Sequence, residues 1–229
     1  MTLIRISRTN FGPTTFLSSS ASPSATYGLP IAHQYLASSC AVTVDHTRIE
    51  CLSTVGIGKG HTWIVAVGNQ TSPASTATTA YKIPAIESLS GSGIVSGSTG
   101  GGEQIVVSGT DFGPAHIVPI LSYGDANDAS SLYYGTSCSV SVAHTQITCL
   151  SAEGTGKDHA MSVRVGGQNS TWSVQNVSYA APTIYNYVTE WVVETSDDGA
   201  STSGGQFVML EGSDFGPVSE SADSVQYGA

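Results

Sequence analysis

Charged side chains are scarce in this sequence, and basic ones are scarcer than acidic ones. Only 10% of the 229 residues are charged, against about 25% in a typical globular protein. The 7 Lys and Arg residues face 17 Asp and Glu residues, which gives a formal net charge of −10. Binding to nucleic acids or to anionic membrane surfaces needs clustered basic side chains that displace counterions. The composition therefore argues against both kinds of partner.

Long hydrophobic runs are also absent. No apolar stretch approaches the roughly 20 residues that a membrane-spanning helix needs. The first ten residues contain no continuous apolar core of the kind found in signal peptides. We therefore expect no insertion into a membrane.

Small and polar residues take the place of the missing charges, with 35 Ser, 24 Thr and 26 Gly. Short runs rich in Val, Ile and Tyr recur between clusters of Gly, Pro, Ser and Asn. Such runs are typical of β-strands separated by turns. A disordered chain usually carries more charge and fewer β-branched and aromatic residues. The sequence therefore predicts an all-β protein.

The sequence repeats itself along its length. The tripeptide Phe-Gly-Pro begins at Phe11, Phe112 and Phe215, at spacings of 101 and 103 residues. A repeat of about 100 residues made of short strands has the size of an immunoglobulin-like sandwich. We therefore predict tandem sandwiches and place the polar stretch 71–79 inside the first of them. Further residues recur at a constant spacing of 98: Cys40 and Cys138, His46 and His144, Cys51 and Cys149, Lys59 and Lys157, His61 and His159, Tyr81 and Tyr179.

The four cysteines occur as two equally spaced pairs. Residues 40–51 and 138–149 alternate apolar and polar residues around a midpoint, which predicts a β-hairpin in each. The first hairpin is expected to turn at the two residues Asp45 and His46. Of three possible connectivities, only the local one closes each repeat by itself. Reduced core cysteines are the alternative, and a zinc site is disfavoured because neither CxxC nor HxxxH spacing occurs. The facing pairs are Val44 with Thr47, Val42 with Ile49, Cys40 with Cys51, Val140 with Ile147, and Cys138 with Cys149.

Three N-glycosylation sequons point to the same compartment as disulfides do. They begin at Asn69, Asn169 and Asn176, and the first two lie in equivalent stretches of the two repeats. Disulfides form in oxidising environments. We therefore expect glycosylation at one or more of these residues and an extracellular or cell-surface location. The dense Ser and Thr also suit O-glycosylation.

The order of these landmarks resembles that of the IPT/TIG family, the immunoglobulin-like modules of plexins and transcription factors. The resemblance covers essentially the whole chain and implies a tandem array of β-sandwiches. The Cys hairpin and the acidity fit the extracellular members of the family. Modules of this family occur in cell-surface receptors and long ectodomain arrays, in DNA-binding transcription factors and as accessory modules of carbohydrate-acting enzymes, so the resemblance leaves the function open. The landmarks are Pro-x-Ile at 84–86 and 182–184, Gly-Gly, an apolar strand into Gly-x-x-Phe-Gly, Tyr-Gly, the Cys hairpin, Gly-x-Gly, and a closing strand ending in Val-Gly.

The aligned repeats divide the chain into unequal parts. Arg8 departs from the pattern, because Gly109 and Gly212 stand at the equivalent positions. Incomplete sandwiches leave open strand edges. Two explanations stay open: the residues are a window of a longer array, or the C-terminal part completes the first module of a neighbouring chain and builds a filament. The parts are 1–82, a module without its leading strand; 83–180, a complete module; and 181–229, the first half of a third module.

No group of residues forms a recognisable catalytic or cofactor site. Residues 154–158 resemble a phosphate-binding loop, but Ser151 and Asp158 stand where that loop needs Gly and Ser or Thr. The copy at 56–60 fails as well, so both are interpreted as turns. No nucleophile lies in a triad context. The duplicated histidines are expected to be structural or exposed: His46, His144, His61 and His159.

The acidic stretches 125–128 and 197–198 are weak candidates for calcium, which prefers several oxygen ligands at short spacing. We interpret both as solvated loops. We therefore expect no metal, no cofactor and no enzymatic activity.

Aromatic residues suggest where contacts form. Tyrosine is frequent and is expected partly in the core and partly in contacts between modules or chains. Trp191 lies in a predicted strand, which is either the leading strand of a third module or the segment that docks into a partner. The tyrosines singled out are Tyr133, Tyr134, Tyr185 and Tyr187.

The preferred function is that of a structural subunit of an extracellular fibre or cell-surface coat, joined head-to-tail into a filament. The alternative is a ligand-binding or adhesion ectodomain of a larger surface receptor. Partners would then be further copies of the chain and covalent glycans, without nucleic acid.

Overall fold

The computed structural model describes residues 2–15, 22–29, 32–128, 131–188, 205, 209–219, 222 and 224–226. Every regular element among these residues is a β-strand, and the strands pair in antiparallel fashion. The predicted all-β fold is confirmed. The described part of the chain contains no helix long and apolar enough to cross a membrane.

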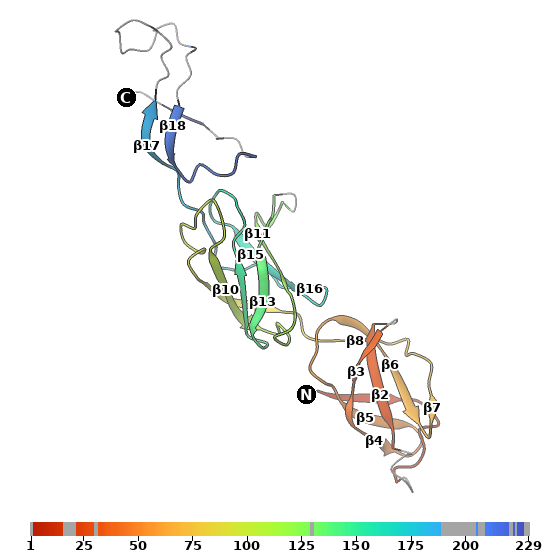
Figure 1. Ribbon diagram of the computed structural model, residues 1–229. Coiled ribbons are helices and arrows are strands. Elements are labelled where there is room, and N and C mark those ends of the chain that lie inside the picture. Colours follow the sequence, from red (N-terminus) through yellow and green to blue (C-terminus); the bar gives the residue numbers. More distant parts are fainter. Residues whose placement is uncertain are drawn as a thin grey trace, which may run out of the picture.

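The first sandwich consists of two facing sheets (Figure 1). One sheet has the strand order β1-β5-β4, and the other has the order β3-β2-β6-β7, with β8 also paired to β6. The strands are β1 (Leu3–Ser7), β2 (Ser24–Leu29), β3 (Ala32–Leu36), β4 (Ser38–Val44), β5 (Arg48–Leu52), β6 (Lys59–Val67), β7 (Gln70–Thr71) and β8 (Thr79–Ala80).

The second sandwich repeats this arrangement with one added strand. Its sheets have the orders β13-β14-β10-β9 and β12-β11-β15-β16. The added strand β9 pairs with β10, the strand that corresponds to β1. The strands are β9 (Ala85–Ser90), β10 (Gln104–Thr110), β11 (Ile120–Gly124), β12 (Tyr133–Tyr134), β13 (Thr136–Val142), β14 (Gln146–Leu150), β15 (Ala160–Val165) and β16 (Gln168–Asn169).

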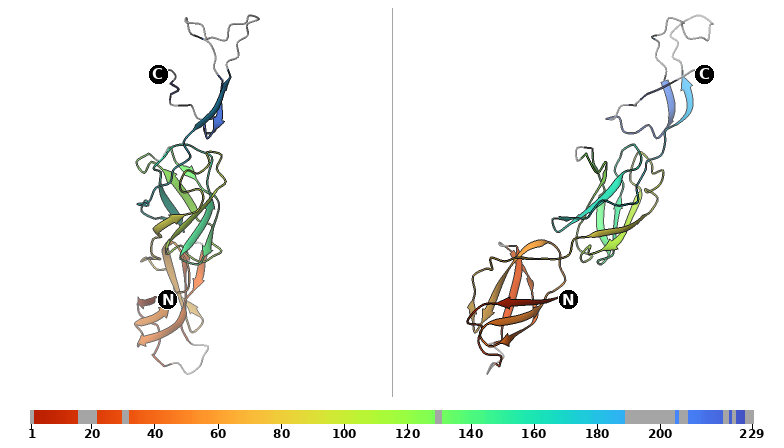
Figure 2. Two further views of the ribbon diagram at one scale, coloured as in Figure 1. Left: turned by 90° about the vertical axis from the view of Figure 1, so that its left-hand side faces the viewer. Right: turned by 180° about the vertical axis from the view of Figure 1, so that it is seen from behind.

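A third, two-stranded sheet follows and copies the β9–β10 pairing. It contains β17 (Thr183–Val188) and β18 (Met209–Ser213). Ile184 faces Gly212 as Ile86 faces Gly109, and an irregularity interrupts both ladders directly after this pair. The three parts follow one another along a line, so that the chain is elongated (Figures 1 and 2).

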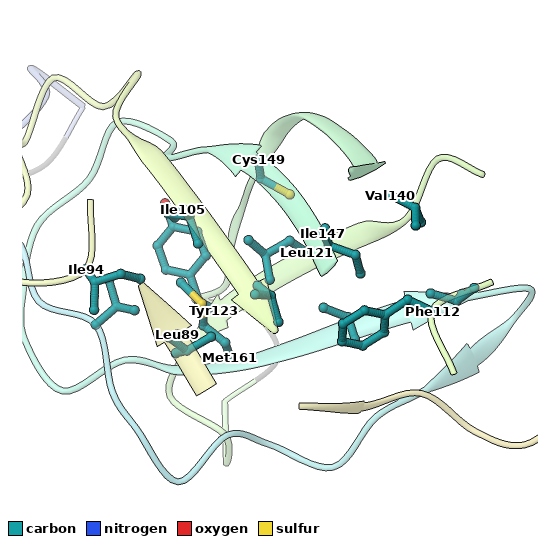
Figure 3. Packing of buried hydrophobic residues seen from close by; sticks show 14 of the residues in the cluster. Leu89, Ile94, Ile105, Phe112, Leu121, Tyr123, Val140, Ile147, Cys149 and Met161 are labelled. Carbon is teal, nitrogen blue, oxygen red and sulfur yellow. The ribbon is translucent and has the colours of Figure 1, made fainter. Parts of the chain in front are cut away.

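Alternating apolar residues build the core of each sandwich. In β10 the side chains of Ile105 and Val107 are fully buried, while their neighbours are only partly covered. Burying such a side chain stabilises the fold by about 1.5–3 kcal/mol. Figure 3 shows how the second core packs Phe112, Leu121 and Met161 from different segments between the sheets. The buried cluster of the first sandwich is smaller but has the same layout.

Each cysteine pair closes a β-hairpin in the predicted register. Val42 faces Ile49 in the first hairpin, and Val140 faces Ile147 in the second. Disulfides join Cys40 to Cys51 and Cys138 to Cys149, with S–S distances of 2.06 Å and 2.00 Å.

The predicted two-residue turn of the first hairpin is wrong. Val44 faces Arg48 rather than Thr47, so the turn contains three residues. The Thr47 amide donates to the Val44 carbonyl at 3.1 Å, and His46 between them has a φ of 64°. An irregularity in the ladder after Val42 shifts the register by one residue.

Serine side chains explain how the polar stretch after β7 stays attached to the first sandwich. The Ser75 amide donates to the Trp63 carbonyl, while the Trp63 amide donates to Ser75 Oγ at 3.0 Å. Ser72 makes the same exchange with Val65. The hydroxyl thus takes the place of a backbone carbonyl, which keeps the β6 edge satisfied without a regular strand.

Removing a disulfide should lower stability measurably. We expect the double substitution Cys138→Ala and Cys149→Ala to reduce the free energy of unfolding of the second sandwich by about 3 kcal/mol, because the cross-link restricts the unfolded chain. Chemical denaturation of the variant and of the wild type, with and without a reducing agent, measures the effect. Reduced wild type should match the variant, and equal stability of reduced and oxidised wild type would contradict the expectation.

Candidate assembly interface

At one end of each sandwich, the Phe-Gly-Pro motif is hydrogen-bonded to the hairpin turn. We call this end the base. In the first sandwich the Phe11 amide donates to the His46 carbonyl at 3.0 Å, and the His46 amide donates to the Gly12 carbonyl at 2.6 Å. Phe112, His144 and Gly113 make the same two bonds in the second sandwich. His46 and His144 therefore act through their backbone, and their side chains are exposed.

The opposite end, its top, is built on tyrosines. In the first sandwich the rings of Tyr27, Tyr35 and Tyr81 surround the buried ring of His61. The hydroxyls of Tyr27 and Tyr81 lie 2.6 Å apart. His61 Nε2 lies 3.1 Å from the Ile57 carbonyl, whereas its Nδ1 is buried without a partner.

These hydroxyls fasten the loop that contains the Gly-x-Gly motif. The Thr54 amide donates to the Tyr27 hydroxyl at 2.9 Å, and the Tyr81 hydroxyl donates to the Thr54 carbonyl at 2.8 Å. The Ile57 amide donates to the Tyr35 hydroxyl at 3.2 Å.

The second sandwich repeats this network with different residue numbers. The Ala152 amide donates to the Tyr123 hydroxyl, and the Tyr179 hydroxyl donates to the Ala152 carbonyl, both at 2.8 Å. The ring of His159 lies among those of Tyr123, Tyr133 and Tyr179. In both tops, tyrosine hydroxyls thus hold the backbone of the Gly-x-Gly loop through hydrogen bonds.

The motif that resembles a phosphate-binding loop has a different role. A Cβ atom on Gly56 would lie 2.6 Å from the Tyr81 hydroxyl, and one on Gly154 would lie 2.5 Å from the Tyr133 ring. These glycines leave room for the tyrosines, and no helix follows either of them in the part of the chain that the structure describes.

The top of the first sandwich packs against the base of the second. Gly113 lies so close to Ile57 that a Cβ on the glycine would overlap the isoleucine side chain. A Cβ on Gly166 would lie 2.6 Å from the Gly58 nitrogen. Gln168 is buried, and its Nε2 donates to the Tyr81 carbonyl at 3.2 Å.

A cavity with a mixed polar and apolar lining remains at this junction. Its volume is about 240 Å³, and Thr2, Ser53, Asp111 and His144 are among its lining residues. Asp111 enters it from the base of the second sandwich.

The junction between the second sandwich and the third part involves the equivalent Phe-Gly-Pro end, with a different contact. The Thr99 amide and hydroxyl both donate to Asp214 Oδ1, at 3.2 Å and 3.4 Å. Asp214 precedes Phe-Gly-Pro as Asp111 does, and both have a φ near 60°. The Phe-Gly-Pro end of each following part thus meets the top of the preceding one, and Figure 2 shows the three parts in succession along the length of the molecule.

Burial makes two of the hydroxyls in the tops, those of Tyr81 and Tyr123, harder to ionise. It raises the pKa of Tyr81, and the hydrogen bond between the Tyr81 and Tyr27 hydroxyls adds to this. Burial also raises the pKa of Tyr123, although bonds to Tyr179 and Ala152 act in the opposite direction. At the first base, the Thr14 amide donates to Asp45 Oδ1 at 2.6 Å, which lowers the pKa of that exposed carboxyl.

The three sequon asparagines are exposed. Asn69 forms, with Gly68, the two-residue turn between β6 and β7, and both residues have positive φ. Asn169 is the second residue of β16, two residues beyond the corresponding turn, and Asn176 lies in the polar stretch before Tyr179. The first two sequons therefore lie in the same region of their respective modules, but not at equivalent positions.

The remaining predicted residues lie apart from the junctions. Asp125 Oδ1 accepts the Asn127 amide at 2.8 Å, as in an ordinary Asx turn. The described ranges contain no group of three or more His, Cys, Asp or Glu side chains that could hold a metal ion. Tyr134 and Tyr185 are exposed. Trp191 and the acidic pair 197–198 lie outside the described residues.

Two facing antiparallel sheets make up an immunoglobulin-like sandwich, and one of them contains the disulfide-linked hairpin. The family model of the IPT/TIG domain matches residues 84–181. This segment, which contains β9 to β16, is an IPT/TIG domain, and the resemblance found from the sequence is confirmed. No curated protein matches the chain. IPT/TIG domains are non-enzymatic modules that, like disulfides, are typical of extracellular or cell-surface proteins.

The tyrosine tops should make the protein sensitive to alkali. Free tyrosine has a pKa of about 10, and burial raises the values of Tyr81 and Tyr123. The folded state keeps protons that the unfolded state loses, so stability is full below about pH 10 and falls as the pH rises above it. Tyrosinate absorbance and circular dichroism followed together should show some tyrosines ionising only as the protein unfolds. Ionisation of all ten tyrosines in a protein that stays folded would contradict this.

The junction should loosen when its hydrogen bond is removed. We expect Gln168→Ala to widen the distribution of orientations between the two sandwiches, because one net hydrogen bond contributes about 1 kcal/mol, or roughly fivefold in population. Small-angle X-ray scattering and NMR relaxation measure this. Gln70→Ala is the matched control, since Gln70 holds the same position in the first sandwich but is exposed. Equal flexibility of both variants would rule out a role for Gln168.

Proposed function

We propose that the chain is a structural subunit of an extracellular fibre or cell-surface coat, built from modules at 1–82, 83–180 and 181–229. The observation that carries this proposal is the end-to-end packing of bases against tops. Ile57, Gly113 and Gln168 hold one junction, and Thr99 with Asp214 holds the next. A rod that continues in one direction is the geometry that a fibre requires.

The surface chemistry supports an extracellular setting. Disulfides persist in oxidising compartments, and the sequons at Asn69, Asn169 and Asn176 present exposed side chains. We propose that at least one of them carries a glycan. A chain with few charges gains solubility from such glycans, which would also cover the exposed flanks of the rod.

Further copies of the same chain are the proposed partners. In the described residues, β1 pairs with β5 on one edge and has no partner on the other. The corresponding strand β10 has β9 at that edge. A leading strand from a second copy would complete the first sheet and join chains head-to-tail, in a way that does not close into a ring.

A binding or adhesion ectodomain is the second candidate. A hollow of about 480 Å³ opens on the second sandwich and is lined by polar side chains that include Asp125, Lys157, His159 and Asn176. A small polar ligand such as a sugar would fit such a lining. We place this function second because the hollow is lined by residues of the second sandwich alone, whereas the junction geometry involves all three parts.

Electron microscopy of the native material tests the proposal. We expect filaments in which the 181–229 part of one chain contacts the 1–82 module of the next. Removal of 182–229 should abolish lengthening while both sandwiches keep their thermal unfolding transitions. Separate short rods in the native material, or filaments that persist after the truncation, would overturn head-to-tail assembly and favour the ectodomain.

A further inference from the structure

The leading strand needs a glycine on the strand that it joins. In the second sandwich, a Cβ on Gly109 of β10 would overlap the carbonyl oxygen of Ala85 in β9 and would lie 2.7 Å from the Phe112 ring. Gly109 has no positive φ, so the requirement is one of space rather than of backbone conformation.

The β17–β18 pair repeats this requirement. A Cβ on Gly212 would overlap the carbonyl oxygen of Thr183 and would lie 2.5 Å from the Phe215 ring. Two independent copies of the leading strand thus cross their partner strand at a glycine that has no room for any side chain.

The first sandwich has Arg8 at this position. The Arg8 amide donates to the Thr47 carbonyl at 2.9 Å, as the Gly109 amide donates to the Thr145 carbonyl at 2.9 Å. The two amides therefore hold equivalent positions beside the hairpin turn, and Arg8 carries a Cβ where the equivalent glycines meet the leading strand.

The rest of the β1 edge is suited to a partner strand. Ile4 and Ile6 pack against the first core but are only half-buried. Their counterparts Ile105 and Val107 are fully buried, in a cluster that includes Leu89 of the leading strand. The β1 edge therefore leaves apolar surface that a strand would cover.

The known registers define how such a strand would lie. Leu89 faces Val107 in the second sandwich, and Tyr187 of β17 holds the register position of Leu89. A second copy's β17 would accordingly place Tyr187 opposite Ile6. Ile184, which precedes Tyr187 in β17, would then face Arg8, and Thr183 would face the residue after Arg8.

We propose that Arg8 limits the pairing between β1 and a leading strand supplied by a second copy of this chain. This inference rests on the proposed head-to-tail assembly. The ladder covers β1 as far as Ser7 and ends there, because the Arg8 Cβ excludes the donor backbone. The joint between chains is then shorter and weaker than the same pairing inside a module, where Gly109 or Gly212 admits the whole strand.

The test compares Arg8→Gly with Arg8→Ala in the full chain. The glycine variant removes the Cβ and should strengthen self-association by about tenfold or more, since two further strand pairs form. The alanine variant loses the charge and the long side chain but keeps the Cβ, so it should associate like the wild type. Sedimentation velocity over a range of protein concentrations gives the dissociation constants.

Two further measurements make the result specific. Hydrogen exchange should become slower in β1 on association, and thermal unfolding should show that both variants fold. Equal strengthening by alanine and glycine would assign the effect to charge and overturn the inference, as would an unchanged glycine variant. If the native protein forms filaments but Arg8→Gly has the dissociation constant of the wild type, the proposed fibre stands and the proposed role of Arg8 is wrong. If Arg8→Gly associates more tightly but the native protein forms no filaments, Arg8 limits strand pairing and the proposed fibre is wrong.

Discussion

Close approach at positions without a Cβ is the constraint on which this structure depends. At the tops, Gly56 and Gly154 leave space for the tyrosine rings that fasten the loops. At the junction, Gly113 and Gly166 allow the backbone of one sandwich to reach the next. A methyl group at any of these places would push apart groups that are in direct contact, because protein interiors have little spare volume.

Neutral hydrogen bonds carry the polar part of the fold in place of charges. Serine hydroxyls such as Ser72 and Ser170 complete the edges of β6 and β15. Tyrosine hydroxyls hold the loops at the tops. The described residues contain two ion pairs, and both involve Glu50. A fold built in this way depends little on salt, and its sensitive groups are the buried hydroxyls.

The repeat made much of the fold predictable. Hairpin register follows from alternation of apolar and polar residues, and Val42 opposite Ile49 is the observed result. The length of the turn at His46 was not predictable from alternation, because a ladder irregularity changes the register by one residue without changing which face Val42 occupies. The tyrosine tops left a signal in the sequence, since Tyr35 with Tyr133 and Tyr81 with Tyr179 keep the constant spacing. Nothing in that spacing reveals that their hydroxyls bind the Gly-x-Gly loop.

The sequence by itself determined the all-β class, the repeat, the hairpins with their cysteines and the resemblance to the IPT/TIG family, because these depend on local periodicity and spacing. Only the tertiary structure decided how the modules meet, and it supplied the basis for the proposal about Arg8. The contacts of Gly113 with Ile57 and of Gln168 with Tyr81 join residues far apart in the chain. The sequence shows that Arg8 stands where the other repeats have glycine. The reason that this matters is structural, because a carbonyl oxygen of the leading strand packs against the equivalent glycines. Such steric conditions arise between separate strands, and no local pattern of residues contains them.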